Sequence, residues 1–152
     1  MIIGGGVLVA ENSVGKLARR LFLEEGYNCA EAAYLAIAKD HSEAEKALGC
    51  RLVGGFGGGA GSGHICGALA GAVAGLGLFF GRQPGEPRAD QLRALAKALS
   101  EGFEAEFGSV NCRDIKPEGE GFRQRCADFV EWSAQEAVRL IDEALVEDDD
   151  CG

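Results

Sequence analysis

Residues 54–77 read GGFGGGAGSGHICGALAGAVAGLG and hold eleven glycines and one cysteine, Cys66. The first half predicts a loop, because each glycine weakens a helix by about 1 kcal/mol relative to alanine. The second half is apolar and rich in alanine, and it predicts a central helix from about Gly63 to Gly81. This stretch decides the fold, because tertiary packing must offset the cost of so many glycines within a helix.

Glycines recur every fourth residue along this predicted helix, at Gly67, Gly71 and Gly75. On a helix, residues four apart share a face, so this spacing removes the side chains from one face. Another backbone can then approach closely. The bare face predicts either tight packing within the chain or a homodimer surface, and Gly67 and Gly71 are structural candidates beside Cys66.

Helical signals dominate the rest of the chain as well. Asn28 followed by Glu31 has the spacing of a capping box, and so has Ser42 followed by Glu45. Residues 51–53 are the one strand-like segment after the N-terminus, and the acidic tail 147–152 is expected to fray. Apolar periodicity and stop signals place the other helices at residues 14–25, 29–37, 42–48, 89–107 and 122–145. The sequence therefore predicts an all-α fold, a single helical domain over residues 1–152 with five or six helices.

Composition narrows the function classes. The 152-residue chain carries a formal net charge of −9, so nucleic-acid binding is not expected, because it needs a basic face. The first ten residues lack the basic start and cleavage site of a signal peptide. The apolar run Ile65–Phe80 is shorter than the roughly 20 residues that span a bilayer, so no membrane insertion is expected. We expect a cytoplasmic protein, in which cysteines stay reduced unless they bind metal or cycle redox state.

The chain has six cysteines and no C-x-x-C pair, so position is more informative than spacing. Each of four cysteines falls near a predicted helix start, namely Cys29, Cys66, Cys112 and Cys126. Unpaired N–H groups and the helix dipole favour thiolate there, which lowers a thiol pKa and makes a better metal ligand or nucleophile. Any one of these thiols could simply be a small core residue. The four together predict a shared redox or metal site.

Other motifs are weaker. The run GFGGGA at residues 55–60 resembles a dinucleotide loop, but no βαβ unit surrounds it, so no nucleotide cofactor is expected. His64 precedes Cys66 by two residues and is a candidate accessory base or ligand, although a solvated or capping histidine fits as well. Cys50 is a second candidate accessory residue, and Cys151 in the acidic tail is a spectator.

Several motifs in order resemble the C-GCAxxG-C-C family of redox-active proteins. The chain reads N-C-A-E at 28–31, F-G-G-G at 56–59, C-G-A-L-A-G at 66–71 and F-G-S-V-N-C-R at 107–113, and a further cysteine follows at 126. The resemblance covers about residues 26–142. At the centre this chain has the order C-G-A where the family label has G-C-A. Carried over by position, the family cysteines are Cys29, Cys66, Cys112 and Cys126.

The resemblance extends to the cluster-bearing part of split-Soret cytochromes, and it implies an iron–sulfur cluster on these four cysteines. The haem-attachment motifs of those cytochromes are missing here, so haem is not expected. The leading hypothesis is a small electron-transfer protein that serves a redox partner protein. A metal-free thiol–disulfide protein, a structural zinc module and a helical scaffold with inert thiols are the alternatives. The sequence leaves catalysis of any reaction open.

Overall fold

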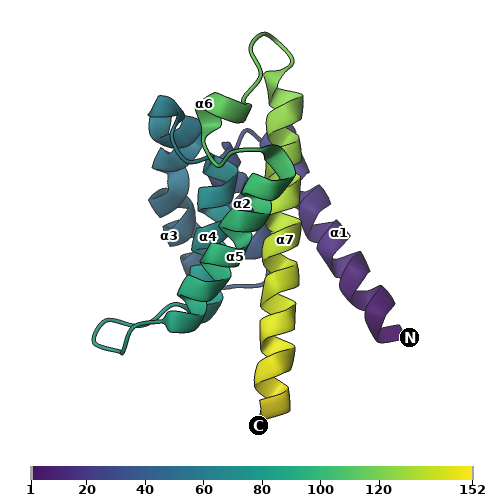
Figure 1. Ribbon diagram of the computed structural model, residues 1–152, viewed down its shortest axis with the longest axis vertical. Helices are drawn as coiled ribbons and strands as arrows, with labels where there is room; N and C mark the ends of the chain where they lie inside the picture. The colour runs from purple at the N-terminus through teal and green to yellow at the C-terminus, as the bar shows by residue number, and fades with distance from the viewer. Residues whose placement is uncertain (1, 152) are drawn as a thin grey trace.

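The computed structural model describes residues 2–151, and side chains from Ser13 to Asp149 (Figure 1). Helices account for nearly all regular structure, and these residues contain no strand, so the all-α prediction is confirmed. A 3₁₀ turn η1 (Gly54–Phe56) and a turn η2 (Gly59–Gly63) separate α3 from α4. The α-helices are α1 (Ile2–Leu23), α2 (Cys29–Ile37), α3 (Glu43–Val53), α4 (Gly67–Phe80), α5 (Asp90–Phe107), α6 (Cys112–Ile115) and α7 (Phe122–Cys151).

The long helix α7 forms the spine of the molecule (Figure 1). It packs against α1, α2, α4 and α5. Helix α2 packs mainly on α4, and α3 lies at the outer edge, where it contacts α2. The short helix α6 lies at one end of the bundle, near the start of α7 (Figure 1). This end brings together the beginnings of several helices.

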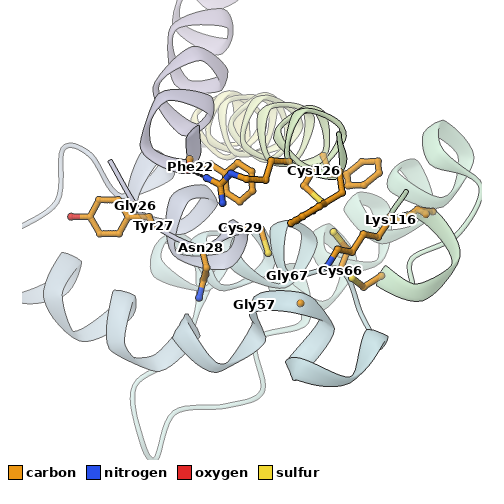
Figure 2. Close-up of a pocket in the computed structure, with 16 residues that line it drawn as sticks. Phe22, Gly26, Tyr27, Asn28, Cys29, Gly57, Cys66, Gly67, Lys116 and Cys126 are labelled. Atoms are coloured by element: carbon orange, nitrogen blue, oxygen red, sulfur yellow. Dashed lines mark hydrogen bonds between the residues drawn. The ribbon is translucent and has the colours of Figure 1, made fainter. Parts of the chain in front are cut away.

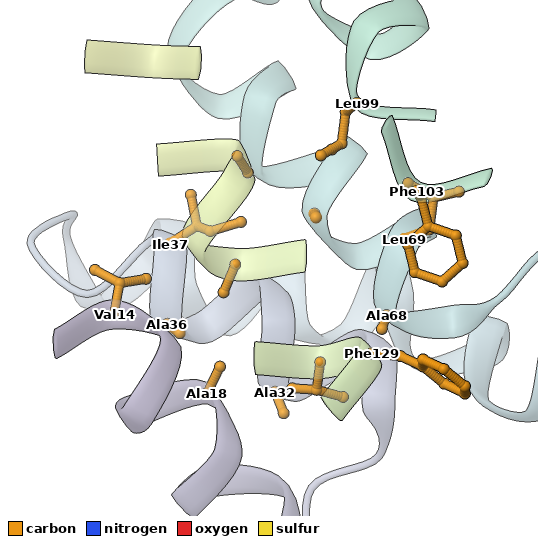
Figure 3. Packing of buried hydrophobic residues seen from close by; sticks show 14 of the residues in the cluster. Val14, Ala18, Ala32, Ala36, Ile37, Ala68, Leu69, Leu99, Phe103 and Phe129 are labelled. Carbon is orange, nitrogen blue, oxygen red and sulfur yellow. The ribbon is translucent and has the colours of Figure 1, made fainter. Parts of the chain in front are cut away.

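The core lies where α1, α2, α4, α5 and α7 meet (Figure 3). Alanines of α1 and α2 let these helices approach α7 closely, and larger side chains come from every one of these helices, including Phe22 of α1 and Ile37 of α2. The largest fully buried apolar side chains are Phe103, Phe129, Leu69, Leu76, Leu99 and Val130. Cys66 belongs to the same core cluster and is 5% exposed. The start of α4 is therefore both core and candidate site.

The glycine face of α4 is used inside the chain. A Cβ at Gly71 would collide with the carbonyl of Ala30 in α2, and one at Gly75 would come within 2.8 Å of Ile37. Only hydrogen on these Cα atoms permits the observed approach of α2 and α4. The face predicted as a packing or dimer surface is thus covered by α2, so it is not available to a second copy.

Helix α4 begins at Gly67, not near Gly63 as the sequence predicted. The residues before it pair with a distant segment, because Ile65 forms an isolated antiparallel bridge with Asn111. Extended backbone at Ile65 prevents an earlier helix start. The helix is the core element that the sequence predicted. Within residues 2–151, no helix is both long and apolar enough to cross a bilayer.

Two other sequence predictions need correction. Residues 51–53 are not strand-like but form the last turn of α3, which the predicted capping box of Ser42 and Glu45 begins. The tail does not fray, because α7 continues through Cys151. Its end carries consecutive acidic residues, and a helical backbone accommodates them by directing the charges to solvent.

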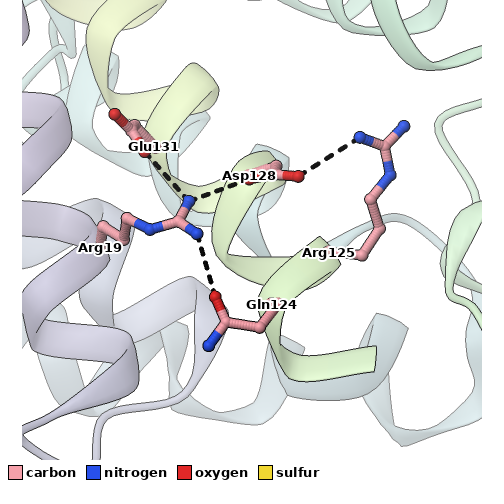
Figure 4. Close-up of polar contacts among 5 residues, drawn as sticks. All are labelled: Arg19, Gln124, Arg125, Asp128 and Glu131. Atoms are coloured by element: carbon pink, nitrogen blue, oxygen red, sulfur yellow. Dashed lines mark hydrogen bonds and ion pairs between the residues drawn. The ribbon is translucent and has the colours of Figure 1, made fainter. Parts of the chain in front are cut away.

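A polar cluster fixes the start of α7 against α1 (Figure 4). The Arg19 guanidinium donates to Asp128 at 2.9 Å, Glu131 at 3.1 Å and Gln124 at 3.1 Å. These three acceptors lie on α7. The contacts with Asp128 and Glu131 raise the pKa of the Arg19 guanidinium, and the Asp128 hydrogen bond is the main cause. The cluster therefore orients the helix turns that carry Cys126.

Candidate functional site

Four cysteines line one cavity of about 260 Å³ at the helix-start end of the molecule (Figure 2). They are Cys29, Cys66, Cys112 and Cys126, and each comes from a different helix start. Cys66 is buried, and the other three thiols are partly exposed. The remaining wall is mostly apolar or glycine, with side chains such as Phe22, Phe122 and Phe129. Among the described residues, no histidine, aspartate or glutamate lines the cavity, so the cysteine sulfur atoms are the anionic donors that they provide.

Cys29 is the first residue of α2, and the predicted capping box holds it. The Glu31 N–H donates to Asn28 Oδ1, and the Asn28 N–H donates to Glu31 Oε1, both at 2.9 Å. The Asn28 amide also donates to the Gly54 carbonyl at 2.9 Å, which ties the glycine loop to this helix start. The cap thus positions Cys29 and one edge of the loop together.

Backbone bonds between two distant segments position Cys66 and Cys112. The Cys66 N–H donates to the Val110 carbonyl at 2.7 Å, and the Cys112 N–H donates to the His64 carbonyl at 2.6 Å. The Ile65–Asn111 bridge lies between these two bonds. This antiparallel pairing brings a thiol before α4 beside a thiol at the start of α6, although 46 positions separate them in the sequence.

The glycine loop folds over the thiols through a left-handed turn. Gly58, Gly59, Ala60 and Gly61 have φ values of +67°, +68°, +57° and +67°. Left-handed backbone strains any residue with a Cβ. Because three of these four residues are glycines, the turn forms with little strain. A Cβ at Gly59 would approach His64 backbone and the Cys112 Cβ within 3.0 Å. The glycines of this loop therefore allow close contact with a cysteine.

Gly67 explains the order of the central motif. A Cβ at Gly67 would collide with the sulfur of Cys29 and with the Phe56 carbonyl. A cysteine at this position would overlap the Cys29 thiol, whereas Cys66 directs its thiol into the cavity (Figure 2). The order C-G-A thus suits this chain, with the sulfur at Cys66 and no side chain at Gly67, where none would fit.

Burial, and not the helix dipole, dominates the thiol pKa values. Burial raises the pKa of Cys66 to about 12, although the backbone amides of Leu69 and Ala68 oppose the shift. Burial raises the pKa of Cys126 to about 11, with Cys29 and Cys112 adding to the shift. Burial is also the main cause that raises the pKa of Cys112. The expectation of lowered pKa values is wrong for these three thiols, because desolvation outweighs the dipole.

The four thiols are close enough to influence one another, since Cys29 raises the pKa of Cys66, Cys112 and Cys126. Among the described residues, however, no three His, Cys, Asp or Glu side chains are arranged to hold one metal ion. A single tetrahedral zinc ion needs thiolates about 2.3 Å from one point. The described thiols therefore do not form the compact group that a single zinc ion requires.

The structure places both accessory candidates outside this cavity. The His64 side chain is exposed, and its Nδ1 lies 3.0 Å from the Arg113 guanidinium, while its backbone positions Cys112. Cys50 lies in a separate groove, where its sulfur is 3.8 Å from Glu31. The side chain of Cys151 lies outside the described residues.

One comparison with known proteins found a match. A family model described as "Putative redox-active protein (C_GCAxxG_C_C)" matches residues 27–140, which include all four cavity cysteines. The chain belongs to the C_GCAxxG_C_C family. The match has nearly the extent that the sequence motifs predicted and confirms the resemblance. No curated protein and no solved structure matches the chain.

Sequence reasoning missed two cationic residues of the cavity in this C_GCAxxG_C_C protein, Lys116 and Arg123. Lys116 follows α6 in a loop that looks like a plain connection, and Arg123 resembles a solvated residue of α7. Their proximity in sequence to Cys112 and Cys126 is the one available signal. Charged residues within four positions of candidate ligands are therefore worth testing as part of a site.

Proposed function

We propose that this C_GCAxxG_C_C protein is a one-electron carrier whose Cys29, Cys66, Cys112 and Cys126 hold an iron–sulfur cluster. The observation that carries the proposal is the convergence of four thiols from four helix starts on one cavity without other anionic donors. Cysteine thiolates are the usual ligands of such clusters. A cluster is wider than a single ion, so it fits thiols that are not grouped around one point.

In this role the chain holds the cluster, excludes water and stabilises negative sulfur. The cluster supplies a reversible one-electron change when it is bound. Phe22, Phe122 and Phe129 form an apolar wall, which limits access of water. The amides of Ala68 and Leu69 favour charged sulfur at Cys66. Each thiol releases its proton when it becomes a ligand.

Two alternatives fit the cavity less well. A structural zinc ion needs a compact group of donors, which the described residues do not form. Metal-free thiol–disulfide exchange needs thiolate near neutral pH. With a pKa of about 11 at Cys126 and about 12 at Cys66, less than roughly one thiol in a thousand is ionised there.

The partial exposure of three thiols suits electron exchange with a partner protein. A low-potential electron donor would reduce the cluster by one electron, and an oxidised acceptor protein would take that electron away. The reduced thiols of the unloaded chain suit a reducing compartment such as the cytoplasm. Neither partner would need to enter the cavity, because three of the four residues that would hold the cluster are partly exposed.

Anaerobic reconstitution with ferrous iron and sulfide tests the proposal. We expect iron and acid-labile sulfide in cluster proportions, visible absorption that dithionite bleaches, and a paramagnetic signal in one of the two oxidation states. Zinc retention without visible absorption in anaerobically purified protein would support a structural ion instead. A chain that binds neither iron nor sulfide would overturn the proposal.

A further inference from the structure

Lys116 (Figure 2) and Arg123 line the cysteine cavity, and neither cation has a carboxylate partner among the described residues. The chain has 24 acidic and 15 basic residues, so a cation without a carboxylate partner is unexpected. Eight of the basic side chains make ion pairs among the described residues, and these two do not. Within residues 13–149, therefore, no carboxylate neutralises their charges.

Aromatic rings and a carbonyl hold these cations in place. The Arg123 guanidinium donates to the Phe22 carbonyl at 2.9 Å and lies 4.8 Å from the centre of the Phe22 ring. The Lys116 ammonium lies 4.5 Å from the centre of the Phe122 ring. Cation–π contacts position a charge without cancelling it. Phe22 and Phe122 also line the cavity, so both cations stand at its wall.

The charges act on the sulfur atoms. Lys116 and Arg123 line the same cavity as Cys112 and Cys126, and each lies within four residues of one of these cysteines along the chain. Four thiolates in a mostly apolar cavity need compensating positive charge, because buried unpaired charge is costly. Reduction by one electron adds one further negative charge, so fixed cations stabilise the reduced state more than the oxidised state.

We propose that Lys116 and Arg123 are the counter-cations of the thiolate centre and raise its reduction potential. This inference rests on the proposed function, and it names the residues that set how readily the centre accepts an electron. They act through the electric field at the cavity wall and are positioning residues, not ligands.

Arg125 provides a matched control on the same turns of α7. It lies 5.2 Å from the Phe129 ring centre, but it does not line the cavity. Asp128 neutralises it at 3.4 Å (Figure 4). A change at Arg125 therefore removes a cation of similar type from nearly the same region without uncovering the thiolates.

Potentiometric titration of the reconstituted proteins tests the proposal with Lys116→Gln, Arg123→Gln, the double variant and Arg125→Gln. We expect a more negative midpoint for each single variant, the largest shift for the double variant, and a smaller shift for Arg125→Gln. Lys116→Arg keeps the charge and should restore the wild-type midpoint. A double variant with the wild-type midpoint, or with the midpoint of Arg125→Gln, would overturn the proposal.

A second measurement does not need the cluster and separates the two proposals. In metal-free, reduced protein at about pH 8, iodoacetamide should alkylate Cys126 several-fold more slowly in the double variant than in Arg125→Gln, because its thiolate fraction falls. Peptide mass spectrometry reads Cys126 separately from the other thiols. Wild-type protein that takes up no iron but shows this difference contradicts only the cluster. Equal alkylation rates contradict the counter-cations.

Discussion

The cysteine cavity and the groove that holds Cys50 are two thiol environments built on the same helix, α2. Both are concave, with volumes of about 260 Å³ and 390 Å³, and burial raises the pKa of Cys50 as it does that of Cys66. Their charges differ. Cys50 faces the Glu31 carboxylate, whereas the cavity thiols face one another and the cations Lys116 and Arg123.

The two thiol environments thus differ in their charged neighbours, although burial raises a thiol pKa in both. Glu31 adds to the raised pKa of Cys50, so this carboxylate disfavours a thiolate at Cys50. The cavity gathers four sulfur atoms and opposes their repulsion with cations and helix N–H groups. We therefore expect metal chemistry at the four thiols and none at Cys50, and the following changes test that contrast.

The largest effect should come from Cys66→Ser. This change removes the most buried of the four cavity thiols, and we expect it to abolish nearly all iron and sulfide uptake, because an alcohol is a far poorer ligand for iron than a thiolate. Cys50→Ser is the matched control and should retain the wild-type metal content. Iron and acid-labile sulfide assays on reconstituted protein measure both. Equal losses in the two variants would erase the contrast between cavity and groove.

Gly71→Ala should have the next largest effect. Its new Cβ would collide with the Ala30 carbonyl, so we expect the free energy of unfolding to fall by about 2 kcal/mol. The forced separation of α2 from α4 should also weaken cluster assembly, because Cys29 moves with α2. Urea unfolding followed by circular dichroism measures the first effect.

Gly77→Ala is the control on the same helix. The nearest atom to a Cβ at Gly77 is in Leu92, at 4.0 Å, so this change should raise the free energy of unfolding by about 1 kcal/mol through helix propensity. If Gly71→Ala is as stable as Gly77→Ala, the close approach of α2 and α4 is not what positions the cavity.

The pH dependence of stability should have a defined sign. An unperturbed thiol has a pKa of 9.0, and Cys66 and Cys126 have values of about 12 and about 11 in the folded chain. Above pH 9 the unfolded chain therefore binds fewer protons than the folded chain. The free energy of unfolding of metal-free protein should fall as pH rises from 9 to 12 and should keep the full thiol contribution below 9.

Urea titrations of reduced protein at several pH values in this range measure the decline. Cys66→Ser should show a shallower decline than wild type, because one raised pKa is lost, while Cys50→Ser should stay nearer wild type. Lysine and tyrosine titrations affect all three proteins alike. Parallel curves for Cys66→Ser and wild type would mean that the buried thiol does not contribute.

The smallest effect should come from Glu31→Gln. Glutamine keeps the capping-box hydrogen bonds but removes the charge beside Cys50. We expect Cys50 to react with iodoacetamide at a lower pH than in wild type, and we expect cluster assembly to be unchanged. Mass spectrometry of alkylated peptides follows Cys50 alone. An unchanged Cys50 profile would mean that burial, and not Glu31, governs this thiol.

Much of the fold follows from local sequence patterns. The capping boxes at Asn28 and Ser42 depend on residues three positions apart, and both form as the sequence predicts. Gly108 ends α5 with a φ of +94°, as a C-terminal glycine should. The four cavity cysteines could also be identified from the sequence, because they lie near helix starts and local sequence signals determine where helices start. These features depend on short-range sterics and hydrogen bonds, which sequence shows directly.

The start of α4 and the thiol pKa values could not be predicted in this way. The start depends on the pairing of Ile65 with Asn111, and a sequence pattern does not show so distant a partner. The pKa values depend on how much solvent each thiol loses on folding. The position of a cysteine at a helix start indicates the dipole effect but not this desolvation. Lys116 and Arg123 were missed for a similar reason, because only packing shows which charges face a cavity.

By itself, then, the sequence determined an all-α chain, its helix caps, a glycine-bared helix around Gly71 and the identity of the four cysteines at helix starts. Tertiary structure alone decided that α2 covers the bare face, that the four thiols share one cavity, that Cys50 stays outside it, and that two cations face the sulfur atoms. The division has one physical reason. Caps and periodicity depend on neighbours along the chain, whereas desolvation and electrostatic fields depend on every atom that folding brings near.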